Sequence, residues 1–346
     1  MMSSLRSNFS LGEPVITKTI ALSVASLFAV AALAQQAQQQ QPTQQRPQQP
    51  AQQPAQQAPP PPRPYQVGTP LGATNEAGQV QTMSSNVKVY GSFNFAESCT
   101  FDPTRNVIVA MNRGNAQMLA PNDGFVSLIK PDGTVHTSKW IGVTRDGLTL
   151  NDPLGSAIAG NTLYIADINT IRRFDLATGT PGAATEIPGA TILNGIAATA
   201  DGTVYVSNTR EPERIYKIAP NGTVSTFADG APLALPNGVA MDTDGNIVVV
   251  NIGTKDVITY NPAGQVVRTE QAAESGNDGV VVTADGTKYT SSVRYGSVSR
   301  IRRGQPAEVI ATGIPSAASM CYDSRQNQLV IPLNPHNALA FIPLGR

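Results

Sequence analysis

Residues 235–251 read LPNGVAMDTDGNIVVVN. An asparagine precedes a short apolar stretch, an Asp-Gly pair follows, and four β-prone residues lead to a second asparagine. Nearly the same phrase occurs as ILNGIAATADGTVYVSN from Ile192 and as SGNDGVVVTADGTKYTSS from Ser275. The three Asp-Gly pairs are 43 and 41 residues apart. A fixed spacing near forty residues indicates a repeat architecture.

A second series of turns has the same period. Its glycines are spaced 46, 43, 42 and 40 residues apart, at Gly133, Gly179, Gly222, Gly264 and Gly304. Between the two kinds of turn are short alternating or β-branched runs such as TVYVSN and RIYKIA, which are typical of strands and hairpins. A repeat of this length with four short strands has the size of one β-propeller blade.

The repeats predict an all-β, six-bladed propeller. The equivalent points at which blades begin are Glu97, Leu154, Asn194, Asn237, Asp278 and Ala318. Blade six offers only three strands, so we expect NVKVYGSF, residues 86–93, to pair with ALAFIP, residues 338–343, and close the ring. An open β-solenoid and a seven-bladed ring are the alternatives.

The N-terminal part has a different composition. After Arg6 and Lys18, an uncharged apolar run ends on Ala-Leu-Ala at residues 32–34, which predicts a cleaved export signal over 1–34. A membrane anchor is the alternative, but the run is shorter than the roughly 20 residues that span a bilayer. Residues 35–85, rich in Gln and Pro, predict a disordered linker. The propeller is expected over 86–346, in the periplasm or outside the cell.

Charge and cysteine content exclude some functions. The 24 Lys and Arg balance the 24 Asp and Glu, and no basic patch favours nucleic acid as a partner. An exported chain permits a disulfide between Cys99 and Cys321 without requiring it, and the sequence leaves that pairing open. Zinc is disfavoured because two cysteines and two histidines provide few of its usual ligands.

The equivalent blade starts predict a metal site. In a propeller the innermost strands border a central channel, so matching residues project toward one axis at one level. Four of the six carry side-chain oxygens: Glu97, Asn194, Asn237 and Asp278. Taken singly, Asn-Gly and Asp-Gly are also ordinary turn dipeptides whose side chains bond local backbone. Together, two carboxylates and two amide carbonyls suit calcium, with magnesium second because it rarely has an all-protein cage.

These residues resemble those of a known superfamily. Glu, Asn, Asn and Asp at the heads of blades one, three, four and five are similar to the calcium site of gluconolactonases and regucalcin, paraoxonases and diisopropyl fluorophosphatase. The resemblance covers roughly residues 86–346, with AESCTFDPTRNVIVA similar to the family's opening phrase. Ser98-Cys99 replaces the usual Gly-Pro, and no histidine stands where the paraoxonase dyad is expected.

The resemblance implies a calcium-dependent hydrolase acting on a small-molecule lactone or ester, which we expect to be a monomer. Calcium would act as a Lewis acid, and Asp278 as general base or nucleophile. Asn277 would orient the substrate or a metal-bound water. Asn151 with Asp152 matches the family's substrate-contacting Asn-Asp pair, although Asn-Asp-Pro is also a common turn. His136 and His336 are expected in a surface hairpin and a loop.

Two other functional classes compete with the hydrolase. A propeller with repeats of the NHL kind can serve as an interaction platform without catalysis, and the Gln/Pro-rich linker would then present it to partners. A lyase similar to the streptogramin lyases is the third possibility, and it would require a catalytic histidine in the channel.

Overall fold

The computed structural model describes residues 73–91, 93–115, 122–142 and 148–345. All of them belong to one compact unit, residues 61–346. The predicted signal peptide, most of the predicted linker and the loop residues 116–121 and 143–147 lie outside the described residues. No helix in the described ranges is both long and apolar enough to cross a bilayer.

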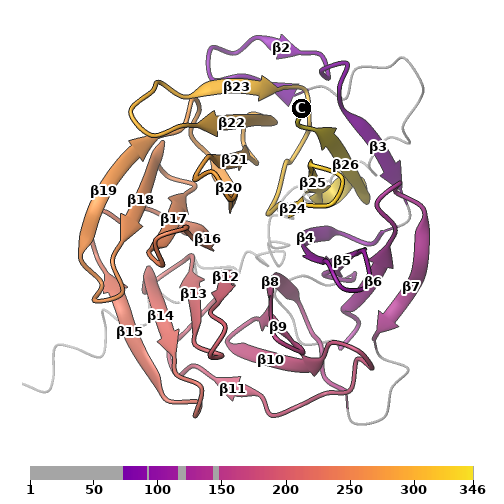
Figure 1. Cartoon of the computed structure of the whole chain (residues 1–346), viewed down its shortest axis with the longest axis vertical. Helices are drawn as coiled ribbons and strands as arrows, with labels where there is room; N and C mark the ends of the chain where they lie inside the picture. The colour runs from indigo at the N-terminus through magenta and orange to yellow at the C-terminus, as the bar shows by residue number, and fades with distance from the viewer. Residues whose placement is uncertain (1–72, 92, 116–121, 143–147, 346) are drawn as a thin grey trace, which may run out of the picture. The chain divides into compact units, whose positions relative to one another are not determined.

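Six four-stranded antiparallel sheets are arranged as the blades of a ring (Figure 1). Blade one contains β4 (Ala96–Asp102), β5 (Val107–Asn112), β6 (Phe125–Ile129) and β7 (Val135–Ile141). Blade two contains β8 (Pro153–Ala159), β9 (Thr162–Asp167), β10 (Thr170–Asp175) and β11 (Thr185–Glu186). Blade three contains β12 (Leu193–Ala198), β13 (Val204–Asn208), β14 (Arg214–Ile218) and β15 (Val224–Asp229).

The second half of the chain repeats this pattern. Blade four contains β16 (Pro236–Met241), β17 (Ile247–Asn251), β18 (Asp256–Tyr260) and β19 (Val266–Gln271). Blade five contains β20 (Asn277–Val282), β21 (Lys288–Ser292), β22 (Ser297–Ile301) and β23 (Glu308–Ala311). Blade six takes β24 (Cys321–Asp323), β25 (Gln328–Leu333) and β26 (Ala338–Pro343) from the C-terminus and β3 (Lys88–Gly91) from the N-terminal side. The six-bladed propeller predicted from the repeat is confirmed.

The ring closes by the predicted pairing of distant strands. Ala338 pairs with Gly91 and Phe341 with Lys88, so β3 forms the outermost strand of blade six. Without this pairing the edge of β26 would be exposed in blade six, and β3 covers that edge.

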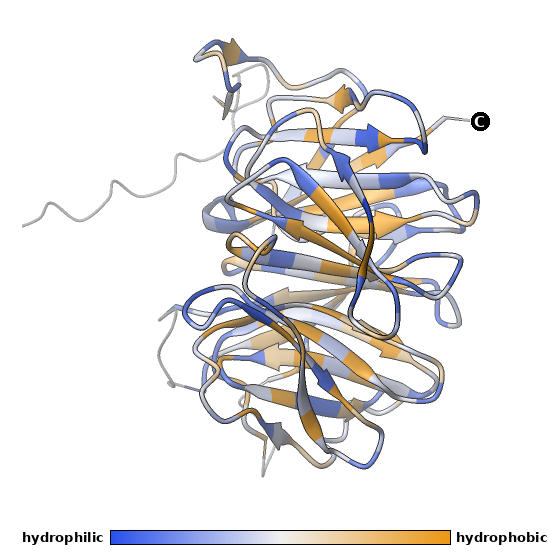
Figure 2. Cartoon of the chain, turned by 90° about the vertical axis from the view of Figure 1, so that its left-hand side faces the viewer, coloured by the Kyte–Doolittle hydropathy of each residue, from blue (hydrophilic) through white to orange (hydrophobic). Residues whose placement is uncertain are grey.

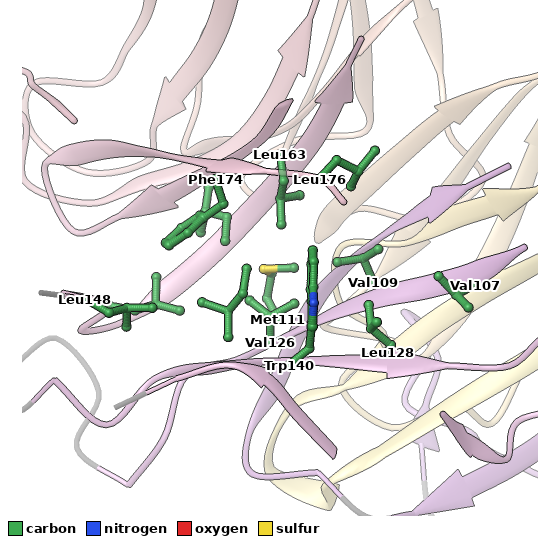
Figure 3. Close-up of a cluster of buried hydrophobic side chains, with 13 residues drawn as sticks. Val107, Val109, Met111, Val126, Leu128, Trp140, Leu148, Leu163, Phe174 and Leu176 are labelled. Atoms are coloured by element: carbon green, nitrogen blue, oxygen red, sulfur yellow. The ribbon is translucent and has the colours of Figure 1, made fainter. Parts of the chain in front are cut away.

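Apolar side chains fill the spaces between neighbouring blades. Figure 2 shows apolar residues concentrated in the strands. One cluster joins blades one and two: Trp140 lies among Met111 and Leu128 of blade one (Figure 3), and Phe174 of blade two belongs to the same cluster. Each large side chain buried in this way stabilises the fold by roughly 1.5–3 kcal/mol. Packing between blades therefore fixes where the inner strands lie.

The second asparagine of the repeated phrase fastens the chain ahead of each inner strand. Oδ1 of Asn208 accepts hydrogen bonds from the backbone N–H groups of Thr191 and Ile192, both at 2.9 Å. Oδ1 of Asn251 accepts from the N–H of Ala234 at 3.1 Å. These bonds satisfy backbone donors that no strand pairing reaches. The asparagine thus holds the start of the inner strand in place.

A two-stranded hairpin precedes the first blade. It consists of β1 (Ala73–Thr74) and β2 (Val80–Gln81), within the range 35–85 that the composition assigned to the linker. Its Ala73 is 6% exposed, and the following Ser84 exchanges hydrogen bonds with Thr312 beyond β23. This part of the predicted linker is therefore packed on blade five.

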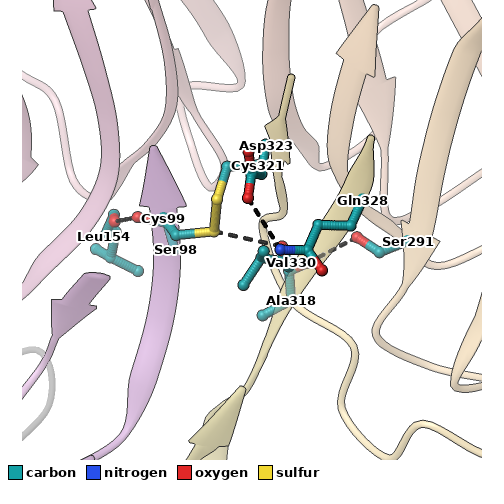
Figure 4. The surroundings of a disulfide bond; sticks show 9 residues. All are labelled: Ser98, Cys99, Leu154, Ser291, Ala318, Cys321, Asp323, Gln328 and Val330. Atoms are coloured by element: carbon teal, nitrogen blue, oxygen red, sulfur yellow. Dashed lines mark hydrogen bonds between the residues drawn. A yellow bond between two sulfur atoms is a disulfide. The ribbon is translucent and has the colours of Figure 1, made fainter. Parts of the chain in front are cut away.

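A disulfide links the inner strands of the first and last blades. Cys99 of β4 and Cys321 of β24 are bonded, with a Cα–Cα distance of 5.4 Å (Figure 4). The neighbouring Ser98 and Ser319 form a parallel β-bridge. We call this junction, Ser98–Cys99 with Ser319–Cys321, the seam. The structure thereby settles the pairing that the sequence left open.

Candidate metal centre

Each candidate ligand lies on a β-bulge at the start of an inner strand. In blade four, Pro236 pairs with Asn251 and Val239 with Val249, so Asn237 and Gly238 together face one residue of the next strand. Blades two, three and five have the same irregularity, and in blade one Glu97 is the single extra residue. A bulge interrupts the alternation of side chains and redirects the extra residue. The predicted equivalent positions of blades one to five therefore correspond in the structure.

Glycines after the bulged ligands allow neighbouring blades to approach closely. A Cβ on Gly195 would lie 2.2 Å from the carbonyl oxygen of Asn237, and a Cβ on Gly238 would lie 2.5 Å from that of Asp278. Such distances exclude any other residue without movement of the backbone. The requirement for glycine explains why Asn-Gly and Asp-Gly recur in the repeat.

These approaches continue around the ring. Gly155 lies against Asn194, Gly279 against Ser319, and the hydroxyl of Ser98 donates a hydrogen bond to the carbonyl oxygen of Leu154. Together with the bridge between Ser98 and Ser319, the contacts connect all six blades at the level of the candidate ligands. A small cavity of about 40 Å³ is lined by Gly155, Gly195 and Gly238 together with Ser98 and Ser319.

The four candidate ligands are buried, and three of them have unused oxygens. Glu97, Asn194, Asn237 and Asp278 are each at most 4% exposed. Oδ1 atoms of Asn194, Asn237 and Asp278 have no hydrogen-bond partner among the described residues. The interpretation of Asn-Gly as a plain turn predicted local backbone bonds that these oxygens do not make. Buried polar atoms without a partner cost about 1–3 kcal/mol each, which points to an additional partner.

The two carboxylates raise the energetic cost of each other's charge. Burial, opposed by the Arg113 charge and assisted by that of Asp152, raises the pKa of Glu97 to about 7, although a hydrogen bond from Asn334 lowers it. Burial and then the charge of Glu97 raise the pKa of Asp278 well above its ordinary value. Two interacting buried carboxylates favour either a proton or a cation between them.

Arg113 and Asp152 form a buried ion pair beside these carboxylates. Nε and Nη2 of Arg113 donate to the two oxygens of Asp152 at 2.6 and 2.8 Å. Burial lowers the pKa of Arg113, but its hydrogen bonds to Asp152 and the charges of Glu97, Asp152 and Asp278 more than reverse that effect. The guanidinium also lies 5.0 Å from the centre of the Phe95 ring. Asp152 therefore holds the positively charged guanidinium of Arg113 next to the candidate metal ligands.

The predicted substrate-contacting residues have other partners in this structure. Oδ1 of Asn151 accepts a hydrogen bond from the N–H of Asn122 at 3.1 Å. The N–H groups of Asn151 and Asp152 both donate to Oδ1 of Asp167. Asp167 is the counterpart of the second asparagine in blade two, so it positions the pair. A role of Asn151 and Asp152 in binding substrate stays a prediction.

Asn277 is held beside Asp278 by its amide nitrogen. Nδ2 donates to the carbonyl oxygens of Thr254 at 3.3 Å and Glu274 at 3.2 Å, whereas the buried Oδ1 has no partner among the described residues. The side chain is thus fixed by two loops with its oxygen left over. This arrangement is compatible with the predicted contact to substrate.

His136 lies in a surface hairpin as expected, whereas His336, expected in a loop, ends a short 3-10 helix. His136 is exposed on β7, and its Nδ1 is 2.9 Å from the hydroxyl of Thr137. His336 ends the short 3-10 helix η1 (Asn334–His336), where partial burial lowers its pKa. Neither histidine belongs to the candidate ligand set.

The donor set fits a hard cation better than a transition metal. No group of three or more His, Cys, Asp or Glu that could hold a metal is found in the part of the chain that the structure describes. The candidate centre instead combines two carboxylates with amide oxygens, which calcium accepts as ligands. This set of oxygen donors is therefore compatible with a bound calcium ion.

Sequence reasoning missed Arg113, Ser319 and Asn334. Arg113 and Asn334 each directly follow the second strand of a blade, next to the position of the second asparagine in the repeated phrase. The phrases VAMNRGN and IPLNPHN carry that signal. Ser319 bonds the carboxylate of Asp278 and occupies the position that glycine holds in most other blades.

The sequence of this chain matches one known protein family. The model of the SMP-30/gluconolactonase/LRE-like region matches residues 73–275, more than half of the chain. The chain belongs to this family. Gluconolactonases of the family are generally metal-dependent. The match ends before Asp278, so the placement of that residue rests on the structure. No curated protein matches the sequence of this chain.

Solved structures share the fold at low identity. A gluconolactonase from Xanthomonas campestris is 18% identical with a TM-score of 0.55, covering 79% of this chain and 94% of that one. A putative gluconolactonase is 15% identical with the same TM-score, covering 79% and 97%. Virginiamycin B lyase from Staphylococcus aureus is 13% identical with a TM-score of 0.52, covering 75% and 99%. These likenesses establish the propeller and no activity.

Proposed function

We propose that the chain is a calcium-dependent hydrolase of lactones or esters, with calcium held by Glu97, Asn194, Asn237 and Asp278. The observation that carries the proposal is the set of buried side chains at one level of the ring, three of which have oxygens without a partner. Membership of the SMP-30/gluconolactonase/LRE-like family supports a hydrolase of the lactonase type.

Calcium fits these residues better than magnesium does. Two carboxylates balance the charge of a dication, and two amide oxygens add neutral ligands. Calcium takes 6 to 8 oxygen ligands in a flexible geometry, so water or substrate can complete the shell. Magnesium demands a stricter octahedron and usually keeps several waters. Magnesium is therefore the second candidate.

When bound, the cation would supply Lewis acidity toward the carbonyl oxygen of a lactone or ester. Asp278 is the candidate general base, because a carboxylate is the best available proton acceptor in a site whose candidate residues include no histidine. Asn277 would orient the substrate through its free oxygen. Water adds to the carbonyl carbon, the bond to the ring or ester oxygen breaks, and the leaving oxygen takes up a proton. The product is a hydroxy acid, or an acid and an alcohol.

We also infer that the protein is exported and acts as a monomer in the periplasm or outside the cell. The support is the apolar run ending on Ala-Leu-Ala before a Gln/Pro-rich segment. N-terminal sequencing of the exported protein tests the cleavage after Ala34, and light scattering tests the monomer.

A calorimetric calcium titration followed by a panel of lactones and aryl esters tests the function. We expect calcium to bind, and hydrolysis of at least one substrate to be lost in chelator and in Glu97→Gln and Asp278→Asn. Asp229→Asn, which alters an exposed ion pair with Arg214 on blade three, is the control and should retain both properties. Calcium binding without turnover would favour the non-enzymatic propeller, and no calcium binding would refute the proposed centre.

A further inference from the structure

The hairpin ahead of blade one touches the loops that hold the Asn277–Asp278 pair. We call residues 73–84 the strap. Its Glu76 forms an ion pair with Lys255, with Oε2 2.6 Å from Nζ. The hydroxyl of Ser275 donates to Oε1 of Glu76 at 3.2 Å, and the N–H of Glu76 donates to Oε1 of Glu274 at 3.3 Å. One strap residue thus contacts two separate loops.

The same two loops fix the side chain of Asn277. Its amide nitrogen donates to the carbonyl oxygen of Thr254, which precedes Lys255, and to that of Glu274. Lys255 also donates to the carbonyl oxygen of Ala273 at 2.9 Å, which joins the loops directly. Glu76 therefore contacts both supports of Asn277 from outside the blade.

The rest of the strap is anchored independently of Glu76. Ala73 packs where any side chain on Gly296 would collide with it, and the N–H of Ser84 donates to the carbonyl oxygen of Thr312 at 3.1 Å. Substitution of Glu76 should therefore leave the strap attached. The ion pair itself is more than a third exposed on both sides, and such pairs contribute little to stability. Its effect on the fold should be small.

We infer that Glu76 is a positioning residue for the candidate metal centre, aligning Asn277 and Asp278 through Lys255, Glu274 and Ser275. The inference rests on the proposed function for the role of Asp278, whereas the contacts themselves fix the side chain of Asn277, the residue before it. Outer-shell partners of metal ligands commonly change metal affinity without contacting the ion. The strap then links the segment before the propeller to the centre.

Two readouts on the full chain test this role. In Glu76→Gln we expect the backbone amides of residues 276–279 to exchange hydrogen faster and calcium to bind about 10-fold more weakly, with the melting temperature nearly unchanged. Asp229→Asn is the matched control, because it also neutralises one partner of an exposed ion pair. It should alter neither readout.

Two further variants show whether Glu76 acts through Lys255: the single variant Lys255→Gln and the double variant Glu76→Gln/Lys255→Gln. If it does, the double variant loses little more than either single variant, because contacting residues are not additive. Unchanged exchange at 276–279 in Glu76→Gln would overturn the inference whether or not calcium binds. Faster exchange in a protein that binds no calcium would support the alignment and refute the metal centre. A lower melting temperature with unchanged exchange and affinity would assign Glu76 to stability alone.

Discussion

The seam between blades one and six and the junctions among blades three, four and five do the same geometric task with different residues. Within blades three to five, Gly195 and Gly238 let the next blade's backbone approach, and the chain continues from one blade to the next. At the seam, Ser98 and Ser319 replace glycine, and a disulfide and β3 join parts of the chain that are far apart in sequence. Blades that follow one another along the chain need only a close approach of their backbones, whereas the seam also needs a disulfide and strand pairing.

The seam affects the site because the candidate ligands lie on both sides of the seam. Asn194, Asn237 and Asp278 come from consecutive blades, but Glu97 belongs to β4 at the seam. The charge of Glu97 acts on Asp278 across this junction. A loosened seam should therefore weaken metal binding even when blades three to five remain intact.

Removing the closing strand should have the largest effect. Deletion of residues 81–95 removes β3 and part of the strap, leaving the edge of β26 unpaired. We expect loss of the cooperative melting transition, measured by circular dichroism. Deletion of 35–64 should change the melting temperature little, because that segment has almost no apolar surface to bury. Equal effects of the two deletions would contradict the assignment of β3.

Breaking the disulfide should have the next largest effect. In Cys99→Ser/Cys321→Ser we expect a loss of about 2–5 kcal/mol in the free energy of unfolding, since the bond constrains a long stretch of unfolded chain. Guanidinium unfolding of the variant and of reduced wild type measures it. Calcium affinity should fall as well, because Glu97 lies two residues from Cys99. An unchanged midpoint would show that β3 alone maintains closure.

A methyl group at a blade junction should have a moderate effect. Gly238→Ala places Cβ against the backbone of Asp278, so we expect a loss of about 1–3 kcal/mol and weaker calcium binding. Gly182→Ala is the matched control, because its nearest neighbour would be 3.6 Å away. Chemical denaturation of both variants gives the comparison. If Gly238→Ala is as stable as Gly182→Ala, close approach does not explain the glycines of the repeat.

The histidines should have the smallest effect. His136→Ala removes an exposed side chain on β7, and His336→Ala removes one from η1 outside the candidate ligand set. We expect calcium affinity and hydrolysis to change little in either variant, because neither histidine belongs to the candidate ligand set. A large loss of hydrolysis in His336→Ala with calcium affinity unchanged would move the catalytic base to that histidine.

The repeated phrase was sufficient to predict the blades and the structural equivalence of Asn194, Asn237 and Asp278, whose role as ligands stays a prediction. Its Asp-Gly turns mark the end of each inner strand, and counting back from them reaches Asn194, Asn237 and Asp278 in correct register. The pairing of β3 with β26 also followed, because a three-stranded blade requires an outer strand. Regular period and strand count are properties that the sequence carries directly.

Contacts between blades could not be read in the same way. Cys99 and Cys321 lie in neighbouring inner strands of a closed ring, but a disulfide requires Cα atoms within about 7 Å, a distance that depends on the bulge geometry. Arg113 meets Asp152 from another blade, and the repeat does not encode that meeting. The strap was hidden by its composition, since its few buried residues follow a Gln/Pro-rich segment.

A crystal structure of the protein grown with calcium tests the central claim most directly. We predict a single ion in the channel with oxygens of Glu97, Asn194, Asn237 and Asp278 at about 2.3–2.6 Å, and its loss in crystals of Asp278→Asn. Anomalous scattering would identify the ion. An ion bound elsewhere, or these four side chains arranged around no ion at saturating calcium, would contradict the metal centre and leave the non-enzymatic propeller as the better explanation.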